Sequence, residues 1–288
     1  MLRIALPNKG RLADQALILL EKAGLKAESR AERALMANLG SDFQAIFVRA
    51  QDIPEFVADG AAVLGVTGAD LVAEAGEPVK ELLDLGFGRC HLAVAVRDDS
   101  PIQCPEELED GTRVASAFPR VTEEYFRGLG LDIKVAPVTG AAEIAPHLGV
   151  AEVIVDLVST GSTLRVNGLR EVGTILESTA RLVVNRDALE DDAKGPVIQE
   201  LVTALESVIR ARSKRYLMTN VPRARLEEVR AVIPGISGPT IVEIQNGGGK
   251  WVAAHAVVDA DKVYSTITRL KGLGAEGILV TQIERLMP

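Results

Sequence analysis

The sequence predicts an α/β protein with two α/β lobes and a C-terminal domain in the ferredoxin-like order βαββαβ. Through residues 1–212, short apolar runs alternate with helix-period patterns, which is typical of parallel sheets covered by helices on both faces. Residues 213–288 change to the order βαββαβ. The chain has 288 residues, 47% hydrophobic and 25% charged, as in globular proteins with sizeable cores.

The first lobe begins with a short apolar strand, Leu2–Leu6, and a turn at Asn8–Gly10. The helix Leu12–Lys22 follows, with apolar residues at positions 12, 16, 17, 19 and 20. The next predicted elements are, in order, strand Ala45–Val48, helix Asp52–Ala58, strand Ala62–Val66 and helix Gly68–Ala75.

The second lobe begins near His91. Its predicted strands are Leu92–Val96, Arg113–Ser116, Ile133–Val138, Val153–Val155 and Glu171–Leu176. Its predicted helices are Pro105–Glu109, Arg120–Leu129 and Ala141–His147. A further strand, Arg181–Val184, a polar loop at Asp191–Gly195 and a long helix, Pro196–Arg212, complete this part of the chain. We predict that lobe I comprises 1–90 and 178–212, and lobe II comprises 91–177.

The C-terminal domain, 213–288, has four predicted strands and two predicted helices. The strands are Tyr216–Asn220, Thr240–Ile244, Trp251–Val258 and Gly277–Ile283, and the helices are Arg223–Val232 and Asp261–Leu273. The turn Asn246–Gly249 joins two alternating strands and lacks the GK[ST] ending of a nucleotide loop, which favours a hairpin. By analogy of fold, such a domain is regulatory or oligomerising.

Composition excludes several classes of function. The net charge is −8, divided as −11 in residues 1–212 and +3 in the rest, so we expect no nucleic-acid partner. The apolar runs are shorter than a membrane span and the N-terminus turns polar after six residues, so we expect a cytoplasmic protein without membrane contact. Two cysteines predict free thiols, and three separated histidines argue against a zinc hydrolase.

The most informative segment runs from Ala151 to Leu169. A buried strand leads to Asp156, and Ser159-Thr160-Gly161-Ser162-Thr163 then opens a helical pattern. Backbone N–H groups and hydroxyls at a helix start form a phosphate cradle, and the helix adds about half a positive charge. A plain Ser/Thr N-cap would explain one hydroxyl, but not four hydroxyls and a glycine in five positions. Asp156 could take sugar hydroxyls or a divalent ion.

This segment resembles the phosphoribosyl pyrophosphate loop of phosphoribosyltransferases. More narrowly, Glu152–Leu164 resembles the signature of ATP phosphoribosyltransferase, the first enzyme of histidine biosynthesis. Further similar segments occur in the same order at Leu2–Leu12, Val48–Pro54, Gly65–Asp70, Gly140–Pro146 and Pro234–Thr240. The chain departs from the family at Phe118, where a tyrosine is common.

The resemblance implies two periplasmic-binding-protein-like lobes that form the catalytic core. The C-terminal domain implies the long form, which carries its own histidine-sensing domain, whereas the short form depends on a partner resembling histidyl-tRNA synthetase. It also implies a homo-oligomer, with dimers that associate into hexamers. We expect inhibition by histidine, with the effector between the strand at Thr240 and the last strand, around Gly277, at a subunit contact.

The implied reaction joins ATP to phosphoribosyl pyrophosphate: adenine N1 attacks the anomeric carbon and pyrophosphate leaves. We expect Ser159, Thr160, Gly161, Ser162 and Thr163 to bind the 5′-phosphate. We expect Asp156 to hold ribose hydroxyls, directly or through Mg²⁺, and Glu143 is a second candidate for the ribose or the metal. The alternative for Glu143 is an ordinary helix carboxylate. Mg²⁺ is the expected cofactor because it binds phosphate oxygens with few protein ligands.

The polyphosphate is expected near cations that follow strands. Lys9 and Arg11 lie in the turn after the first strand, and Arg49 lies at a strand end. Thr67, Gly68 and Asp70, at another strand-to-helix turn, are predicted on the nucleotide side. Arg120 is a weaker candidate. The alternative for the cations is simple exposure to solvent.

Three other functions compete with this interpretation. A solute-binding protein would also have two α/β lobes, but we expect it to carry a signal peptide. A phosphoribosyltransferase for nucleobases usually has two adjacent acids before the loop, whereas Leu157 follows Asp156 here. A pure sensor would leave the Ser159–Thr163 cradle unexplained.

Overall fold

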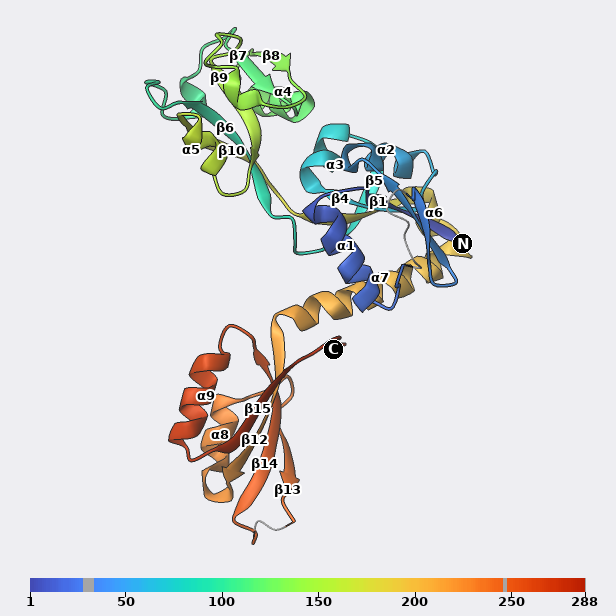
Figure 1. The fold of residues 1–288 in the computed structure, drawn as a ribbon, viewed down its shortest axis with the longest axis vertical. Helices are drawn as coiled ribbons and strands as arrows, with labels where there is room; N and C mark the ends of the chain where they lie inside the picture. Colours follow the sequence, from blue (N-terminus) through green and yellow to red (C-terminus); the bar gives the residue numbers. More distant parts are fainter. Residues whose placement is uncertain (28–33, 246–247, 288) are drawn as a thin grey trace. The chain divides into compact units, whose positions relative to one another are not determined.

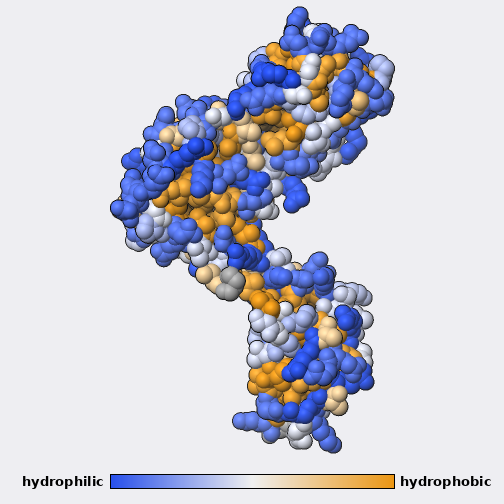
Figure 2. Space-filling model, turned by 180° about the vertical axis from the view of Figure 1, so that it is seen from behind, coloured by the Kyte–Doolittle hydropathy of each residue, from blue (hydrophilic) through white to orange (hydrophobic). Residues whose placement is uncertain are grey.

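A computed structural model describes residues 1–27, 34–245 and 248–287 (Figure 1). The chain forms two compact units, Met1–Gln199 and Glu200–Pro288, and helix α7 (Lys194–Arg212) runs from the first into the second. Within the described ranges, no helix is long and apolar enough to cross a membrane. Hydrophilic residues cover most of the face in Figure 2, with smaller hydrophobic patches between them.

The first sheet of unit 1 has the order β2-β3-β1-β4-β11-β5. Its strands are β1 (Leu2–Pro7), β2 (Met36–Leu39), β3 (Phe43–Val48), β4 (Leu64–Gly68), β5 (Val79–Asp84) and β11 (Ala180–Asn185). β1 pairs parallel with β3 and β4, whereas β2 and β11 pair antiparallel with their neighbours. The expectation of a parallel sheet is therefore right at the centre and wrong toward the edges, because β2 and β3 form a hairpin and β11 enters from the other lobe.

The helices of this lobe include the predicted helix after the first strand, in which Ala16, Leu19 and Leu20 are buried as expected and Leu12 and Leu17 are half-buried. The helices are α1 (Arg11–Lys22), α2 (Ile53–Ala58), α3 (Ala69–Ala75) and α6 (Arg186–Glu190), with a 3₁₀ turn, η1, at Ala50–Asp52. Helix α1 buries Ala13, Ala16, Leu19 and Leu20. The sequence interpretation missed β2, β5 and α6. Both strands lie outside the parallel centre of the sheet and are largely unburied, so they lack an apolar run.

The second sheet of unit 1 has the order β10-β6-β9-β7-β8. Its strands are β6 (Cys90–Arg97), β7 (Arg113–Ser116), β8 (Lys134–Pro137), β9 (Val153–Val158) and β10 (Leu169–Ser178). β7 is parallel to β8 and β9, and β6 is antiparallel to β9 and β10, so this sheet is mixed as well. The accompanying helices are η2 (Pro105–Glu107), α4 (Pro119–Gly128), η3 (Ala142–Ile144) and α5 (Ser162–Val166).

The predicted helix Ala141–His147 is wrong, because only the 3₁₀ turn η3 forms there. Ala141 has φ +52°, a left-handed conformation that a helix cannot continue. Pro146 has no N–H to donate to the carbonyl of Ala142. Glu143 therefore lies in a tight turn rather than in a regular helix.

The chain passes between the two sheets twice, at 85–89 and at Thr179. The second passage is a single residue. Beside it, the Ser178 hydroxyl donates to Asp70 Oδ1 at 2.5 Å, and the Thr179 hydroxyl donates to Asp84 Oδ1 at 2.8 Å. Asp70 and Asp84 thus bind the two residues at which the chain passes from β10 to β11.

Unit 2 contains the ferredoxin-like domain that the sequence predicts. Its elements are β12 (Lys214–Pro222), η4 (Arg223–Arg225), α8 (Leu226–Val232), β13 (Thr240–Glu243), β14 (Trp251–Asp259), α9 (Val263–Gly272) and β15 (Glu276–Gln282). The sheet order is β13-β14-β12-β15, with every pair antiparallel. The predicted turn Asn246–Gly249 includes 246–247, which lie outside the described residues.

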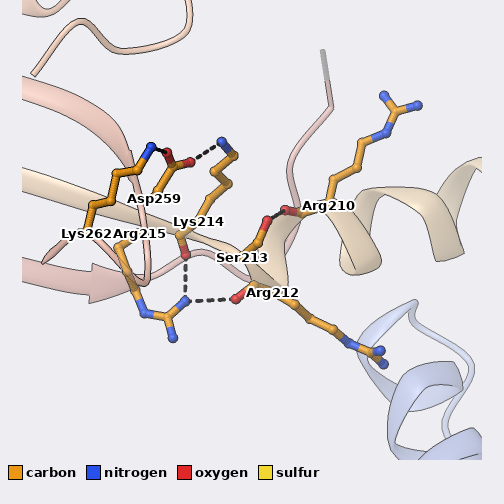
Figure 3. A network of polar contacts seen from close by, with 7 residues as sticks. All are labelled: Arg210, Arg212, Ser213, Lys214, Arg215, Asp259 and Lys262. Atoms are coloured by element: carbon orange, nitrogen blue, oxygen red, sulfur yellow. Dashed lines mark hydrogen bonds and ion pairs between the residues drawn. The ribbon is translucent and has the colours of Figure 1, made fainter. Parts of the chain in front are cut away.

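Side chains satisfy the carbonyl groups where α7 passes into β12 (Figure 3). Arg215 Nη1 donates to the carbonyls of Arg212 at 3.1 Å and Lys214 at 2.7 Å. The Asp259 carboxylate accepts from Lys214 Nζ at 2.5 Å and from Lys262 Nζ at 3.1 Å. These two hydrogen bonds lower the pKa of Asp259. Arg215 thus satisfies a carbonyl at the end of the helix, and Asp259 joins the first strand of the domain to the third.

Candidate functional site

The Ser159–Thr163 loop connects the end of β9 with the start of α5. β9 continues through Asp156 to Val158, and α5 begins at Ser162, three residues after the helix start that the sequence suggests. Gly161 precedes the helix with φ +67°, a left-handed conformation that glycine adopts without strain. The loop is therefore a strand, a tight turn and a short helix, with the glycine at the point where the backbone must reverse.

The loop lines a pocket of about 370 Å³, which we call the substrate pocket. Arg11, at the start of α1, and Glu143, in η3, line it together with Asp156 and the continuous run from Leu157 to Leu164. Ser159, Thr160, Ser162 and Thr163 are all exposed. The fold thus brings the predicted phosphate loop, both predicted carboxylates and one predicted cation to one pocket.

The carboxyl group of Asp156 is held in an unfavourable electrostatic environment. Burial raises its pKa and the negative charge of Glu143 raises it further, while a hydrogen bond from the Leu157 N–H lowers it. That N–H donates to Asp156 Oδ1 at 2.7 Å. A cation or sugar hydroxyls at this position would relieve the cost of the buried charge.

Two carboxylates are the protein ligands that a magnesium ion could use here. The described residues contain no group of three or more His, Cys, Asp or Glu side chains that could hold a metal. Mg²⁺ commonly binds through one or two carboxylates and completes its shell with water and substrate phosphate. Glu143 and Asp156 fit that pattern.

The remaining predicted residues do not line the substrate pocket. Lys9 is exposed in the turn before α1, and Arg49 pairs with Asp52 at 3.0 Å. The Thr67 hydroxyl is fully buried and donates to the Ala50 carbonyl at 2.7 Å. Asp70 is buried and accepts from Ser178, while Gly68 precedes α3. These contacts give Thr67 and Asp70 structural roles in lobe I.

Replacing Ser178 with alanine is expected to destabilise the protein without a direct effect on the substrate pocket. The substitution removes the hydroxyl that donates to Asp70 Oδ1 and leaves a buried carboxylate with fewer partners. The expected loss is about 1–3 kcal/mol of unfolding free energy, measured by denaturant titration. An unchanged midpoint would show that the Ser178–Asp70 bond does not stabilise the fold.

The sequence interpretation missed Arg165 and Glu171. Arg165, in α5, donates from Nη2 to the Thr160 carbonyl at 3.2 Å. Glu171, on β10, has Oε2 at 2.7 Å from His91 Nε2. No local motif marks either residue. Arg165 is five positions after Thr160, but the sequence pattern does not show where its side chain points, and Glu171 is near the loop because β10 lies against α5.

The predicted effector residues lie on opposite edges of the C-terminal sheet. Thr240 begins β13 and Gly277 is on β15, and the strands β14 and β12 separate them. Thr240 is in register with His255, and Gly277 has φ +58°. The predicted site between these strands therefore does not form within one copy of this domain.

Comparisons with known proteins cover the whole chain. The sequence model described as "ATP phosphoribosyltransferase" matches residues 49–207, and the model described as "HisG, C-terminal domain" matches residues 211–285. The chain is 58% identical to an ATP phosphoribosyltransferase from Gemmatimonas aurantiaca and 45% identical to one from Methanosarcina acetivorans, with full coverage of both proteins in each case.

A solved structure has a similar fold. It is a chain of the ATP phosphoribosyl transferase (HisG:HisZ) complex from Thermotoga maritima, with a TM-score of 0.65 and 28% sequence identity. The match covers 100% of that chain and 74% of the present one. About a quarter of the present chain has no counterpart in it.

Proposed function

The chain belongs to the ATP phosphoribosyltransferase family, and from this premise we propose how its residues perform the reaction. The enzyme catalyses the first step of histidine biosynthesis: it transfers the phosphoribosyl group of phosphoribosyl pyrophosphate to N1 of the ATP adenine and releases pyrophosphate. The substrates are therefore both anions, and the site must hold them in line while the bond to pyrophosphate breaks.

We propose that the substrate pocket binds phosphoribosyl pyrophosphate. One observation carries this proposal: four exposed loop hydroxyls, two carboxylates and Arg11 line the same pocket. The backbone N–H groups and hydroxyls of Ser159–Thr163 bind the 5′-phosphate. Asp156 accepts hydrogen bonds from the ribose hydroxyls, and its negative charge favours the positive ribose that develops as pyrophosphate leaves.

We propose Mg²⁺ as the cofactor, held by Glu143 and Asp156. When bound, the ion neutralises charge on the leaving pyrophosphate. The residues of the chain need to supply no general base, because adenine N1 already carries a lone pair. Their task is to bind, orient and stabilise charge.

We propose that ATP binds on the side of the pocket formed by lobe I, near Arg11. Lys9 and Arg49 are further candidates for contact with the polyphosphate. For Thr67, Gly68 and Asp70, the proposed contribution to the nucleotide site is indirect, through the shape of the turn between β4 and α3.

Replacing Arg11 with glutamine is expected to raise the apparent KM for at least one substrate about tenfold, since a charged hydrogen bond contributes about 1.5–3 kcal/mol. Lys22→Gln removes the same charge from the other end of the same helix, and Lys22 does not line the pocket. Its KM values should stay within about twofold of the original. Steady-state kinetics with each substrate varied in turn checks this pair. Equal effects of Arg11→Gln and Lys22→Gln on the KM values would show that Arg11 has no specific contact with a substrate.

We propose that histidine inhibits the enzyme through the C-terminal domain, 213–288. Thr240 and Gly277 lie on opposite sheet edges, so an effector site that uses both requires a second copy of the domain. This agrees with the proposed homo-oligomer of dimers and hexamers. We also propose a cytoplasmic location without a nucleic-acid or membrane partner.

Removal of residues 213–288 is expected to abolish inhibition by histidine. The experiment compares pyrophosphate release by the full chain and the shortened chain, with and without histidine. Activity of the shortened chain in the absence of histidine is the control. Inhibition that persists in the shortened chain would place the effector in the catalytic lobes.

A further inference from the structure

The substrate pocket is one of two pockets lined by residues around Gly161. A second pocket of about 540 Å³, which we call the rear pocket, is lined by Asp98, Gly161, Leu164, Arg165, Leu169, Arg170 and Glu171. Gly161 and Leu164 line both pockets. Side chains in the rear pocket can therefore contact the loop without lining the substrate pocket.

Arg165 makes such a contact. Its guanidinium donates from Nη2 to the Thr160 carbonyl oxygen at 3.2 Å. Nη1 lies 3.0 Å from the position that a Cβ on Gly161 would occupy. Arg165 lines the rear pocket and is not among the residues of the substrate pocket.

The orientation of the Thr160 carbonyl matters for phosphate binding by this loop. Gly161 has no side chain to restrict its backbone, so the peptide group between Thr160 and Gly161 can rotate more freely than others. A rotation of that peptide would turn its oxygen toward the bound anion and its N–H away, which is repulsive. A guanidinium on the Thr160 oxygen opposes this rotation.

We propose that Arg165 is a positioning residue for binding of phosphoribosyl pyrophosphate. It holds the Thr160 carbonyl on the side of the rear pocket, so that the loop presents N–H groups and hydroxyls to the 5′-phosphate. This inference rests on the proposed location of that substrate.

Glu171, on strand β10, also lies close to the loop. Its Oε1 lies 3.3 Å from the position of a Cβ on Gly161, and its Oε2 lies 2.7 Å from His91 Nε2. Arg165 and Glu171 thus both lie close to Gly161, beside the Thr160 carbonyl.

The test compares Arg165→Met with Arg170→Met. Arg170 lines the same pocket and donates from Nη2 to the carbonyls of Ser100 at 2.9 Å and Ile102 at 2.6 Å. Among the described residues, no hydrogen bond joins Arg170 to the Ser159–Thr163 loop. Arg165→Met should raise the KM for phosphoribosyl pyrophosphate about tenfold, with kcat and the KM for ATP within about twofold. Arg170→Met should lower the Tm and leave both KM values unchanged.

Raising the salt concentration distinguishes a positioning effect of Arg165 from long-range attraction by its charge. The ratio of KM values between Arg165→Met and the original enzyme should persist when the salt is raised to about 1 M, where the Debye length is about 3 Å. A ratio that falls to one would show that Arg165 acts as a remote charge, and equal changes in both KM values would show a general structural defect. Either result overturns the proposal.

Thr163→Val distinguishes this inference from the assignment of the pocket. If Thr163→Val raises the KM for phosphoribosyl pyrophosphate and Arg165→Met does not, the pocket assignment stands and the role of Arg165 is wrong. If neither variant changes that KM, the proposed location of the substrate is itself wrong.

Discussion

Asp156→Asn is expected to lower kcat/KM about a hundredfold and at the same time to stabilise the folded protein. The loss of activity follows from removing a charge-assisted hydrogen bond to the ribose and one ligand of the proposed magnesium ion; a single such bond contributes about 1.5–3 kcal/mol. The gain in stability follows from the raised pKa of Asp156, which reflects burial and the nearby charge of Glu143. An amide keeps an oxygen acceptor for the Leu157 N–H, which donates at 2.7 Å.

The direction of the pH dependence is fixed by that pKa. A carboxyl group whose pKa is raised in the folded state does not destabilise the fold while it is protonated. Its ionisation lowers the free energy of unfolding as the pH rises. Near pH 8, Asp156→Asn should therefore have a higher free energy of unfolding than the original protein. The gain should shrink as the pH is lowered toward the ordinary carboxyl range. Denaturant titrations at several pH values, in the absence of substrate and magnesium, check this.

Glu109→Gln is the matched control for Asp156→Asn. Glu109 is an exposed acid of the same lobe outside the substrate pocket, so its neutralisation should change neither activity nor stability by more than about 0.5 kcal/mol. Full activity of Asp156→Asn would remove this residue from the proposed site. A loss of stability at pH 8 would show that the carboxylate has a stabilising partner in the free protein.

Gly161→Ala is expected to weaken binding of phosphoribosyl pyrophosphate at least tenfold. The backbone at Gly161 has φ +67°, which costs a non-glycine residue about 1–2 kcal/mol. The added Cβ would lie 3.0 Å from Arg165 Nη1 and 3.3 Å from Glu171 Oε1. The loop can relieve the backbone strain and the two close contacts by moving. Such movement displaces its N–H groups from the phosphate.

Gly149 provides a control for the strain alone. It has the same φ, +67°, and an added Cβ would meet no atom within 4 Å. It does not line the substrate pocket. Gly149→Ala should therefore lose about 1–2 kcal/mol of unfolding free energy and keep its affinity for the substrate. Equal affinities in Gly161→Ala and the original protein, measured by calorimetry, would contradict the phosphate role of the loop.

The sequence predicts most of the fold because its strands and helices have strong apolar periodicity. The central strands β1, β4 and β9 and the helix α1 follow directly from buried apolar runs. The ferredoxin-like order of the C-terminal domain is confirmed by the all-antiparallel sheet. Edge strands such as β5 escape detection, because most of their side chains are not buried and the pattern carries no apolar signal.

The candidate site is predicted in part. The hydroxyl-rich loop, Asp156 and Glu143 are recognised from residue type and resemblance, and they do lie together. Thr67 and Asp70 show the limit of that reasoning. Their place at a strand-to-helix junction suggests ligand contact, but the Thr67 hydroxyl is bonded to the Ala50 carbonyl and Asp70 is bonded to Ser178 at the end of β10. Arg165 shows the opposite error: it is only five residues from Thr160, but the sequence pattern does not show that its guanidinium turns back to the Thr160 carbonyl.

We propose that the hydroxyls of Ser159–Thr163 bind the phosphate of phosphoribosyl pyrophosphate. Thr163→Val tests it most directly, because it removes one hydroxyl from a side chain that lines the substrate pocket and keeps the side-chain volume. The measurement is a calorimetric titration of the full chain with phosphoribosyl pyrophosphate and magnesium. We expect a dissociation constant about tenfold higher for the variant, the loss of one hydrogen bond to a charged group. The same dissociation constant for both proteins would contradict the assignment of this loop.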